Sequence, residues 1–265
     1  MADWHWQTWQ GRDCLTCDLL QPWPHGFFTR QFWPQSPADL VGTLAADAAV
    51  QRVKQVHGNR VLTPADLPAG QVDDPRAEAD GLLSDGANQA LWVCSADCSP
   101  VLIGDRTTGQ VAAIHAGWRG TAQAIVPLAV GKMQAQGSRL DDLVVAIGPA
   151  IAGEVYQVSL DVAAAVGRTL IAAAPDDDGA VVAALQQWDN SPVRPDATPG
   201  KVRLDVRLAN GWQLAQLGLG QDQVAIAPHC TFQEPERFFS YRRTGEKQVQ
   251  WSGIVSRGER PPTGL

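Results

Sequence analysis

Three nearly continuous apolar runs lie close together in the middle of the chain, at residues 90–95, 100–104 and 110–114. Uninterrupted apolar runs of this length are typical of strands that are covered on both faces. The stretch 105–109 between the last two runs has the composition of a hairpin with a glycine near its end, so we expect those two strands to pair antiparallel. A sheet with material on both sides follows from this pattern.

Helix and strand patterns alternate along the rest of the chain. We expect helices near 38–50, 116–133, 159–174 and 204–215, and further strands near 53–62 (interrupted at Gly58), 142–148, 222–227 and 248–256. Pro127 falls inside the second helix and predicts either a late helix start or a kink. Because no internal repeat or long linker divides the chain, we predict one α/β (α+β) domain over residues 1–265, with a mixed β-sheet core flanked by helices.

The composition is that of a globular protein, with 45% apolar and 18% charged residues. A net charge of −7 provides no general attraction for polyanions, so we expect neither nucleic acid nor an anionic membrane as a partner. The chain contains no run of about 18 apolar residues, and its first residues do not have the pattern of a signal peptide, which makes the cytoplasm the default location. The sequence does not determine the oligomeric state.

The five cysteines are unevenly spaced, at 14, 17, 94, 98 and 230. An odd number with this spacing argues against a disulfide framework. Cys14 and Cys17 form a single C-x-x-C without a second pair or the strand-helix pattern of a redox fold, so two small apolar positions beside a strand are the simpler interpretation.

His57, Cys98 and His115 are the candidate metal ligands, each at a predicted strand end or beside a glycine. Two imidazoles and a thiolate suit zinc (Zn²⁺), and three protein ligands leave one coordination position open, as a catalytic site requires. The distance of His57 from the other two in the sequence leaves three separate buried structural residues as the alternative.

Cys98 and His115 are equally compatible with a nucleophile and its base, with Asp97 or Asp80 orienting the imidazole. Neighbouring residues on a strand point to opposite faces, so Asp97 is expected to diverge from Cys98, which favours Asp80. If His229 or Cys230 joined the cluster as a fourth ligand, the metal site would be closed and structural.

Two groups of arginines are candidates for binding an anionic substrate. Arg119 lies between two glycines at a possible helix start. Arg242 and Arg243 follow Tyr241 in a second basic and aromatic cluster, suited to stacking on a base or sugar and binding phosphate. A surface arginine and a structural ion pair are the respective alternatives.

Five short motifs occur in a fixed order between about residue 52 and residue 256. They are Lys54-Gln-Val-His57-Gly, Ala96-Asp-Cys98-Ser-Pro, His115-Ala-Gly-Trp-Arg-Gly120, Ile147-Gly-Pro149 and Phe238-Phe-Ser-Tyr-Arg-Arg243. This set resembles the signature of the YfiH-type laccase-domain proteins, which are described as purine nucleoside phosphorylases and carry an older label as multicopper polyphenol oxidases. The chain departs from that pattern at Ala150 and Glu154, where the family often has cysteine.

The resemblance implies a single α/β domain with zinc on the positions His57, Cys98 and His115. It also implies phosphorolysis of adenosine, inosine, guanosine and methylthioadenosine, together with adenosine deamination. For this chemistry we hypothesise that Asp80 or Asp97 moves protons and that Arg119 and Arg242 hold phosphate. An amidohydrolase that edits peptidoglycan precursors through Cys98 and His115, and a non-catalytic domain with structural zinc, are the alternatives. Five histidines are too few for a multicopper assembly, which argues against the oxidase label.

Overall fold

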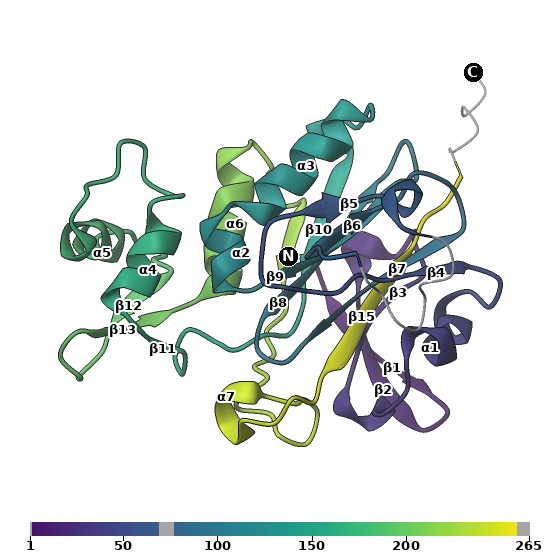
Figure 1. Cartoon of the computed structure of the whole chain (residues 1–265), viewed down its shortest axis with the longest axis horizontal. Helices are drawn as coiled ribbons and strands as arrows, with labels where there is room; N and C mark the ends of the chain where they lie inside the picture. Colours follow the sequence, from purple (N-terminus) through teal and green to yellow (C-terminus); the bar gives the residue numbers. More distant parts are fainter. Residues whose placement is uncertain (1, 69–76, 259–265) are drawn as a thin grey trace.

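The computed structural model describes residues 2–68 and 77–258 (Figure 1). Two six-stranded sheets and one three-stranded sheet make up its β structure. The strands of the first sheet, in spatial order, are β1 (Trp4–Trp9), β2 (Arg12–Cys17), β3 (His25–Phe28), β15 (Gln250–Val255), β7 (Gln89–Ser95) and β4 (Ala49–Gln51). Those of the second are β14 (Val224–Ile226), β10 (Leu143–Ile147), β8 (Ser99–Asp105), β9 (Val111–Ala116), β6 (Gly81–Leu83) and β5 (Val61–Leu62). The small sheet contains β11 (Gln157–Ser159), β13 (Lys201–Leu204) and β12 (Val193–Pro195).

Seven α-helices and four short 3-10 helices accompany these sheets within the described residues. The α-helices are α1 (Pro37–Leu44), α2 (Trp118–Ala122), α3 (Ile125–Ala135), α4 (Leu160–Gly167), α5 (Asp178–Gln186), α6 (Val206–Gln216) and α7 (Tyr241–Thr244). The 3-10 helices are η1 (Asp18–Leu20), η2 (Arg30–Phe32), η3 (Pro64–Asp66) and η4 (Leu140–Asp142). Within the same described ranges, no helix has both the length and the apolar character needed to cross a membrane.

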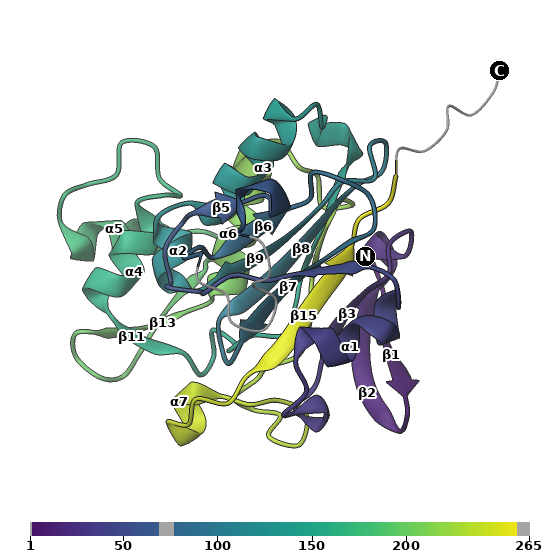
Figure 2. The ribbon, with the colours of Figure 1, turned by 45° about the vertical axis from the view of Figure 1, so that its right-hand side comes forward.

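The two large sheets share one core. Leu91 and Val93 of the first sheet are buried against Leu102 and Ala113 of the second. The opposite face of the second sheet packs against α3 and α6, and the opposite face of the first packs against α1 (Figures 1 and 2). Strands covered on both faces bury every side chain, which explains the uninterrupted apolar runs. The predicted mixed α/β fold, with sheets flanked by helices, is confirmed.

The predicted hairpin at the centre is present. β8 and β9 pair antiparallel, with Ile103 opposite Ala112. Gly109 has φ +75°, a value that favours glycine at the turn. The hairpin therefore brings Ser99, next to Cys98, opposite Ala116, next to His115.

The helix predicted over 116–133 is two helices. Ala124 between them has φ +54°, which ends α2, and α3 begins at the next residue. Pro127 is the third residue of α3, where the missing N–H breaks no helical hydrogen bond. The late helix start is thus confirmed.

Three predicted elements differ in the structure. The helix expected to reach Ala174 ends at Gly167, and the chain continues in turns. Gly167 lets α5 pack closely, since a Cβ there would lie within 2.7 Å of Leu185 and Val181. The helix expected over 38–50 ends at Leu44, since 49–51 pair with β7. Only residues 61–62 of the predicted strand 53–62 lie in a strand.

Candidate functional site

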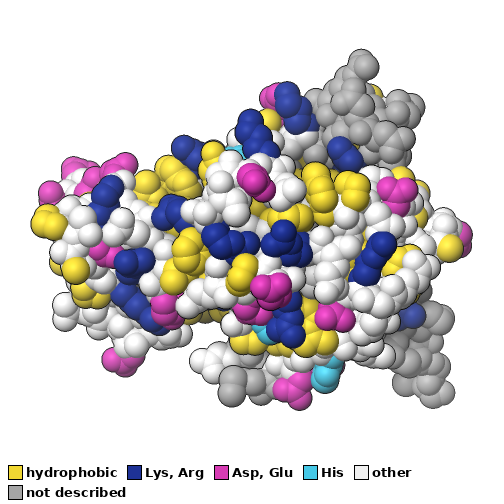
Figure 3. Space-filling view, turned by 90° about the horizontal axis from the view of Figure 1, so that it is seen from below, with side chains coloured by type: hydrophobic (Ala, Val, Ile, Leu, Met, Phe, Trp, Pro, Cys, Tyr) yellow, Lys and Arg dark blue, Asp and Glu magenta, His cyan; other side chains and the backbone are white. Residues whose placement is uncertain are grey.

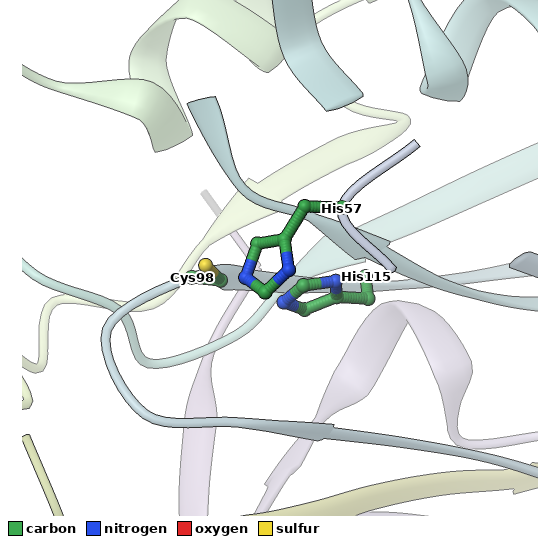
Figure 4. Close-up of side chains that lie close together, drawn as sticks. All are labelled: His57, Cys98 and His115. Atoms are coloured by element: carbon green, nitrogen blue, oxygen red, sulfur yellow. The ribbon is translucent and has the colours of Figure 1, made fainter. Parts of the chain in front are cut away.

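The three predicted metal ligands converge. His57 lies in the loop between β4 and β5, Cys98 in the turn between β7 and β8, and His115 in β9. One ligand atom of each lies within 4.8 Å of those of the other two. Figure 4 shows both imidazole rings and the sulfur gathered at one point. His115 is buried, Cys98 is half-buried and His57 is exposed, so the cluster opens to solvent on the His57 side.

Asp80 holds two of these ligands. Its fully buried carboxylate accepts a hydrogen bond from Nδ1 of His115 at 2.9 Å and one from the backbone N–H of His57 at 2.9 Å. It also accepts from the backbone N–H groups of Gly58 at 2.7 Å and Val56 at 3.2 Å. Burial raises the pKa of this carboxyl group, but the hydrogen bonds from His115 and the loop amides outweigh it and lower the pKa below the ordinary value.

These hydrogen bonds explain a strained backbone at His57. Its φ of +61° is unusual for a residue other than glycine. Hydrogen bonds from the consecutive amides 56–58 to one carboxylate compensate for that conformation. The loop is thereby held in the shape that turns the His57 ring toward Cys98.

Cys98 and His115 form a charged pair in the protein without metal. Burial alone raises the pKa of a thiol, yet the positive charge and hydrogen bond of His115 lower the pKa of Cys98 to about 6. For His115 burial acts to lower the pKa, but the Cys98 thiolate and Asp80 raise it to about 9. A thiolate and an imidazolium therefore coexist at neutral pH, and the sulfur is in the state required of a ligand or a nucleophile.

Two glycines of the HAGWRG motif make room for the cluster. A Cβ at Gly117 would lie 2.7 Å from Sγ of Cys98, and one at Gly120 would lie 3.0 Å from the carbonyl oxygen of Gly58. Real Cβ atoms do not come as close as the first of these values. These glycines therefore allow α2 to pass directly beside the site.

The donor set fits a borderline-soft divalent metal. Two imidazole nitrogens and one thiolate are typical zinc ligands, and the carboxylate on the far nitrogen of His115 is the usual outer partner of a ligating histidine. His229 and Cys230 do not take part. His229 is bound to Glu234 at 3.0 Å, and the Cys230 sulfur accepts from the amide of Ala152 at 3.2 Å.

Asp97 points away from Cys98. Its carboxylate accepts hydrogen bonds from the Thr231 hydroxyl and from the backbone N–H of Arg242, each at 2.7 Å. Asp97 and Cys98 lie in a turn rather than on a strand, and Asp97 is not among the residues of the metal-ligand cluster.

The four residues predicted to bind substrate differ in how far their side chains are already bound by the protein. Arg119 is exposed, stacks on the Trp118 ring at 4.5 Å, and donates no side-chain hydrogen bond to a described residue. Arg242 stacks on the Tyr156 ring at 4.7 Å and donates to the Gln157 carbonyl at 2.8 Å.

Arg243, by contrast, donates hydrogen bonds to three backbone carbonyls of the protein. It donates to the carbonyls of Thr231, Phe232 and Phe238 at 2.6, 2.9 and 2.7 Å, so it secures the segment rather than a ligand. Tyr241 is 56% exposed at the start of α7. Figure 3, viewed from the side where α7 lies, shows Lys and Arg side chains across the middle of this face, beside hydrophobic and acidic ones.

Tyr156 is a site residue that the sequence did not reveal. Burial and the nearby Cys98 thiolate raise the pKa of its hydroxyl to about 12, while Arg242 and Arg119 act in the opposite direction. The tyrosine is therefore close to the metal-ligand cluster and to both arginines. In the sequence, only its position after the Gly148-Pro149 turn could have indicated that Tyr156 belongs to the site. No spacing rule connects Tyr156 to Arg242.

The two cysteines of the C-x-x-C are not part of the metal-ligand cluster. Cys14 and Cys17 are buried on β2, where burial raises their pKa values to about 12 and about 11. In the part of the chain that the structure describes, the group of His57, Cys98 and His115 is the only one suited to a metal.

Known proteins resemble this chain over nearly its whole length. It is 54% identical over 263 residues to purine nucleoside phosphorylase slr1573 of Synechocystis sp., covering 96% of this chain and 97% of the relative. It is 35% identical over 197 residues to the purine nucleoside phosphorylase of Haemophilus influenzae, covering 72% and 68%. The crystal structure of YlmD from Geobacillus stearothermophilus superposes with a TM-score of 0.76 at 26% identity, covering 95% of this chain and 98% of that one.

A family model described as "Multi-copper polyphenol oxidoreductase laccase" matches residues 37–256. That span includes all three candidate ligands and both arginine motifs. The chain therefore belongs to the multi-copper polyphenol oxidoreductase laccase family, which the five sequence motifs had indicated.

Proposed function

We propose that this protein is a zinc-dependent purine nucleoside phosphorylase that also deaminates adenosine. The convergence of His57, Cys98 and His115 at an open site beside Arg119 and Arg242 carries the proposal. The names of the relatives support a nucleoside phosphorylase in particular. Adenosine, inosine, guanosine and methylthioadenosine are the proposed substrates, with inorganic phosphate as the second reactant.

The arginines supply the phosphate side of the reaction. In phosphorolysis a phosphate oxygen bonds to C1′ of the sugar while the bond from C1′ to the purine nitrogen breaks, and the purine leaves with a proton. Positive charge develops on the sugar, so a phosphate dianion held beneath it stabilises the transition state. The guanidinium of Arg119 has all its donors free of described residues, and Arg242 keeps donors beyond the one bound to Gln157.

The metal-ligand cluster supplies the purine side. Zinc held by His57, Cys98 and His115 acts as a Lewis acid when bound, which suits both departure of the base and hydrolytic loss of the adenine amino group. Asp80 keeps His115 in the tautomer whose Nε2 faces the cluster. The exposed side at His57 provides the entrance for substrate.

The test measures product release before and after chelation. Purified protein is incubated with inosine and phosphate, and hypoxanthine and ribose 1-phosphate are quantified; a parallel assay follows conversion of adenosine to inosine. We expect both activities to disappear on chelation and to return with zinc. His57→Gln should be inactive, whereas His5→Gln, at an exposed histidine on β1, is the matched control. Undiminished hypoxanthine release from metal-free protein would end the zinc mechanism.

The charged pair of Cys98 and His115 favours one second candidate. A thiolate beside an imidazolium that is itself oriented by a carboxylate is the arrangement of a cysteine amidohydrolase. That function predicts stoichiometric alkylation of Cys98 in protein that contains no metal, with amide hydrolysis lost in proportion. A structural four-ligand zinc site has no such support, because His229 and Cys230 are bound elsewhere.

A further inference from the structure

Hydrogen bonds of Asp97 connect the turn that contains Cys98 with three distant segments. Its carboxylate oxygens accept from the Thr231 hydroxyl and from the backbone N–H of Arg242, both at 2.7 Å. Its carbonyl oxygen accepts from the N–H of Ile151 at 3.0 Å. Ile151 follows β10, Thr231 follows β14, and Arg242 lies in α7, so one residue gathers all three beside the metal-ligand cluster.

The backbone of Asp97 adopts a rare conformation. Its φ of +87° is in the left-handed region, where among residues other than glycine aspartate and asparagine are the best tolerated. Such conformations persist only where the surroundings over-determine them. The three hydrogen bonds of Asp97 provide that constraint.

Hydrogen bonds connect both carboxylate oxygens of Asp97 to the short helix α7. One reaches the backbone of Arg242 directly. The other reaches Thr231, whose carbonyl accepts a hydrogen bond from the Arg243 guanidinium at 2.6 Å. Since α7 has only four residues and buries none of them, contacts of this kind fix its place against the cluster.

We propose that Asp97 is a positioning residue for phosphate, and that it acts by holding Arg242 rather than by transferring protons. The proposal rests on the proposed function, in which Arg242 binds the phosphate. With its backbone fixed by Asp97, Arg242 stacks on Tyr156 at 4.7 Å and donates to the Gln157 carbonyl at 2.8 Å. These contacts place its guanidinium beside a tyrosine whose pKa the Cys98 thiolate also raises.

The direction in which phosphate affinity changes when Asp97 is replaced distinguishes this positioning role from a purely electrostatic one. Removing a negative charge next to a phosphate site would by itself strengthen phosphate binding. Loss of the hydrogen bond to Arg242 would weaken it instead. Asp97→Gly is the informative change, because glycine adopts φ +87° without strain and removes both carboxylate contacts. An asparagine would keep an acceptor for the Arg242 N–H and could donate its N–H₂ group to the Thr231 hydroxyl.

The experiment compares Asp97→Gly with wild type and with Asp141→Gly, a control at a highly exposed carboxylate. Zinc content, kcat and the KM for phosphate are measured with inosine, and hydrogen exchange is followed in the peptide 238–245. We expect unchanged zinc content, a kcat within about twofold, and a phosphate KM raised about tenfold, the scale of one lost hydrogen bond to a charged group. In an Arg242→Met background the same change should have no further effect on KM.

An unchanged or lower phosphate KM in Asp97→Gly would overturn the proposal, as would a lower kcat with a displaced pH profile, which would identify a proton carrier. If wild type releases no hypoxanthine, the proposed function fails. The hydrogen-exchange data then decide whether Asp97 holds α7. Faster exchange at residues 241–244 in the Asp97 variant supports this role, and unchanged exchange refutes it. Should Asp97→Gly fold poorly, Asp97→Asn is the second variant. It keeps an acceptor for the Arg242 N–H but removes the negative charge, so positioning predicts an unchanged phosphate KM, and a lower KM would overturn the proposal.

Discussion

Nδ1 of His115 donates a hydrogen bond to the carboxylate of Asp80 at 2.9 Å, and this contact leaves Nε2 as the nitrogen that faces Cys98. An ionised carboxylate only accepts, so the proton must lie on Nδ1. The same carboxylate accepts from the amide of His57. One buried acid thus sets the orientation of one ligand and the backbone of another.

Asp80→Asn should weaken metal binding without unfolding the protein. In either orientation of the amide, its N–H₂ group faces hydrogen-bond donors: the N–H groups of Val56 and Gly58 in one, and the His57 N–H and Nδ1 of His115 in the other. Loss of an outer partner of a ligand typically lowers metal affinity about 10–100-fold. Competition with a chromophoric chelator measures this, with Asp141→Asn as the control. Wild-type zinc affinity in Asp80→Asn would contradict the assigned role.

Alkylation of metal-free protein should be selective for Cys98 and depend on pH. Its lowered pKa of about 6 makes the reactive thiolate abundant above that pH and scarce below it. Burial raises the pKa of Cys14 and Cys94 to about 12, so neither should react at neutral pH. Iodoacetamide labelling followed by peptide mass spectrometry measures the profile.

The control for that profile is His115→Gln. Without the imidazolium, burial again dominates the pKa of Cys98, and labelling at neutral pH should fall sharply. Equal labelling of Cys98 and Cys94 at pH values above 6, or a profile unaffected by His115→Gln, would show that no charged pair forms.

The central strands were predictable because local patterns determine them. Burial on both faces leaves an unbroken apolar run, and the residues that follow the runs, Cys98 and His115, are necessarily neighbours once the hairpin pairs. His57 required more, because its loop comes from a distant segment. Its residue type and the adjacent Gly58 indicated a ligand, but only the family motif connected it to the other two.

Long-range contacts account for what the sequence left open. Asp80 was a candidate among several acids, and its role depends on four hydrogen bonds to two segments that no spacing rule specifies. Tyr156 and Arg242 are in contact although 86 positions separate them in the sequence. Gly167 at the end of α4 packs against side chains of α5, a contact that helix propensity does not contain.

Arg119→Met should weaken phosphate binding while leaving the metal in place. The methionine keeps an apolar chain over Trp118 but removes a guanidinium that donates no hydrogen bond to a described residue. Loss of one charge-assisted contact corresponds to a rise in phosphate KM of about tenfold or more. Steady-state kinetics with varied phosphate measures it. An unchanged phosphate KM would place Arg119 outside the phosphate site.

Gly117→Ala should damage the metal site by one methyl group. The glycine has φ −70° and ψ 171°, a conformation that alanine adopts freely, so backbone strain has no part in the effect. The new Cβ would lie 2.7 Å from Sγ of Cys98 and 3.5 Å from Cδ2 of His57, and the sulfur must move. Overpacking costs about 1–3 kcal/mol, which corresponds to a loss of about tenfold or more in zinc affinity.

Gly131→Ala is the matched control for that variant. Gly131 lies inside α3 with no atom within 4 Å of its added Cβ, so alanine there should raise the melting temperature, because it favours a helix over glycine by about 1 kcal/mol. Zinc affinity and thermal unfolding are measured for both. If Gly117→Ala binds zinc as tightly as Gly131→Ala, the close approach of α2 to Cys98 does not shape the site, and the function of the HAGWRG glycines must lie elsewhere.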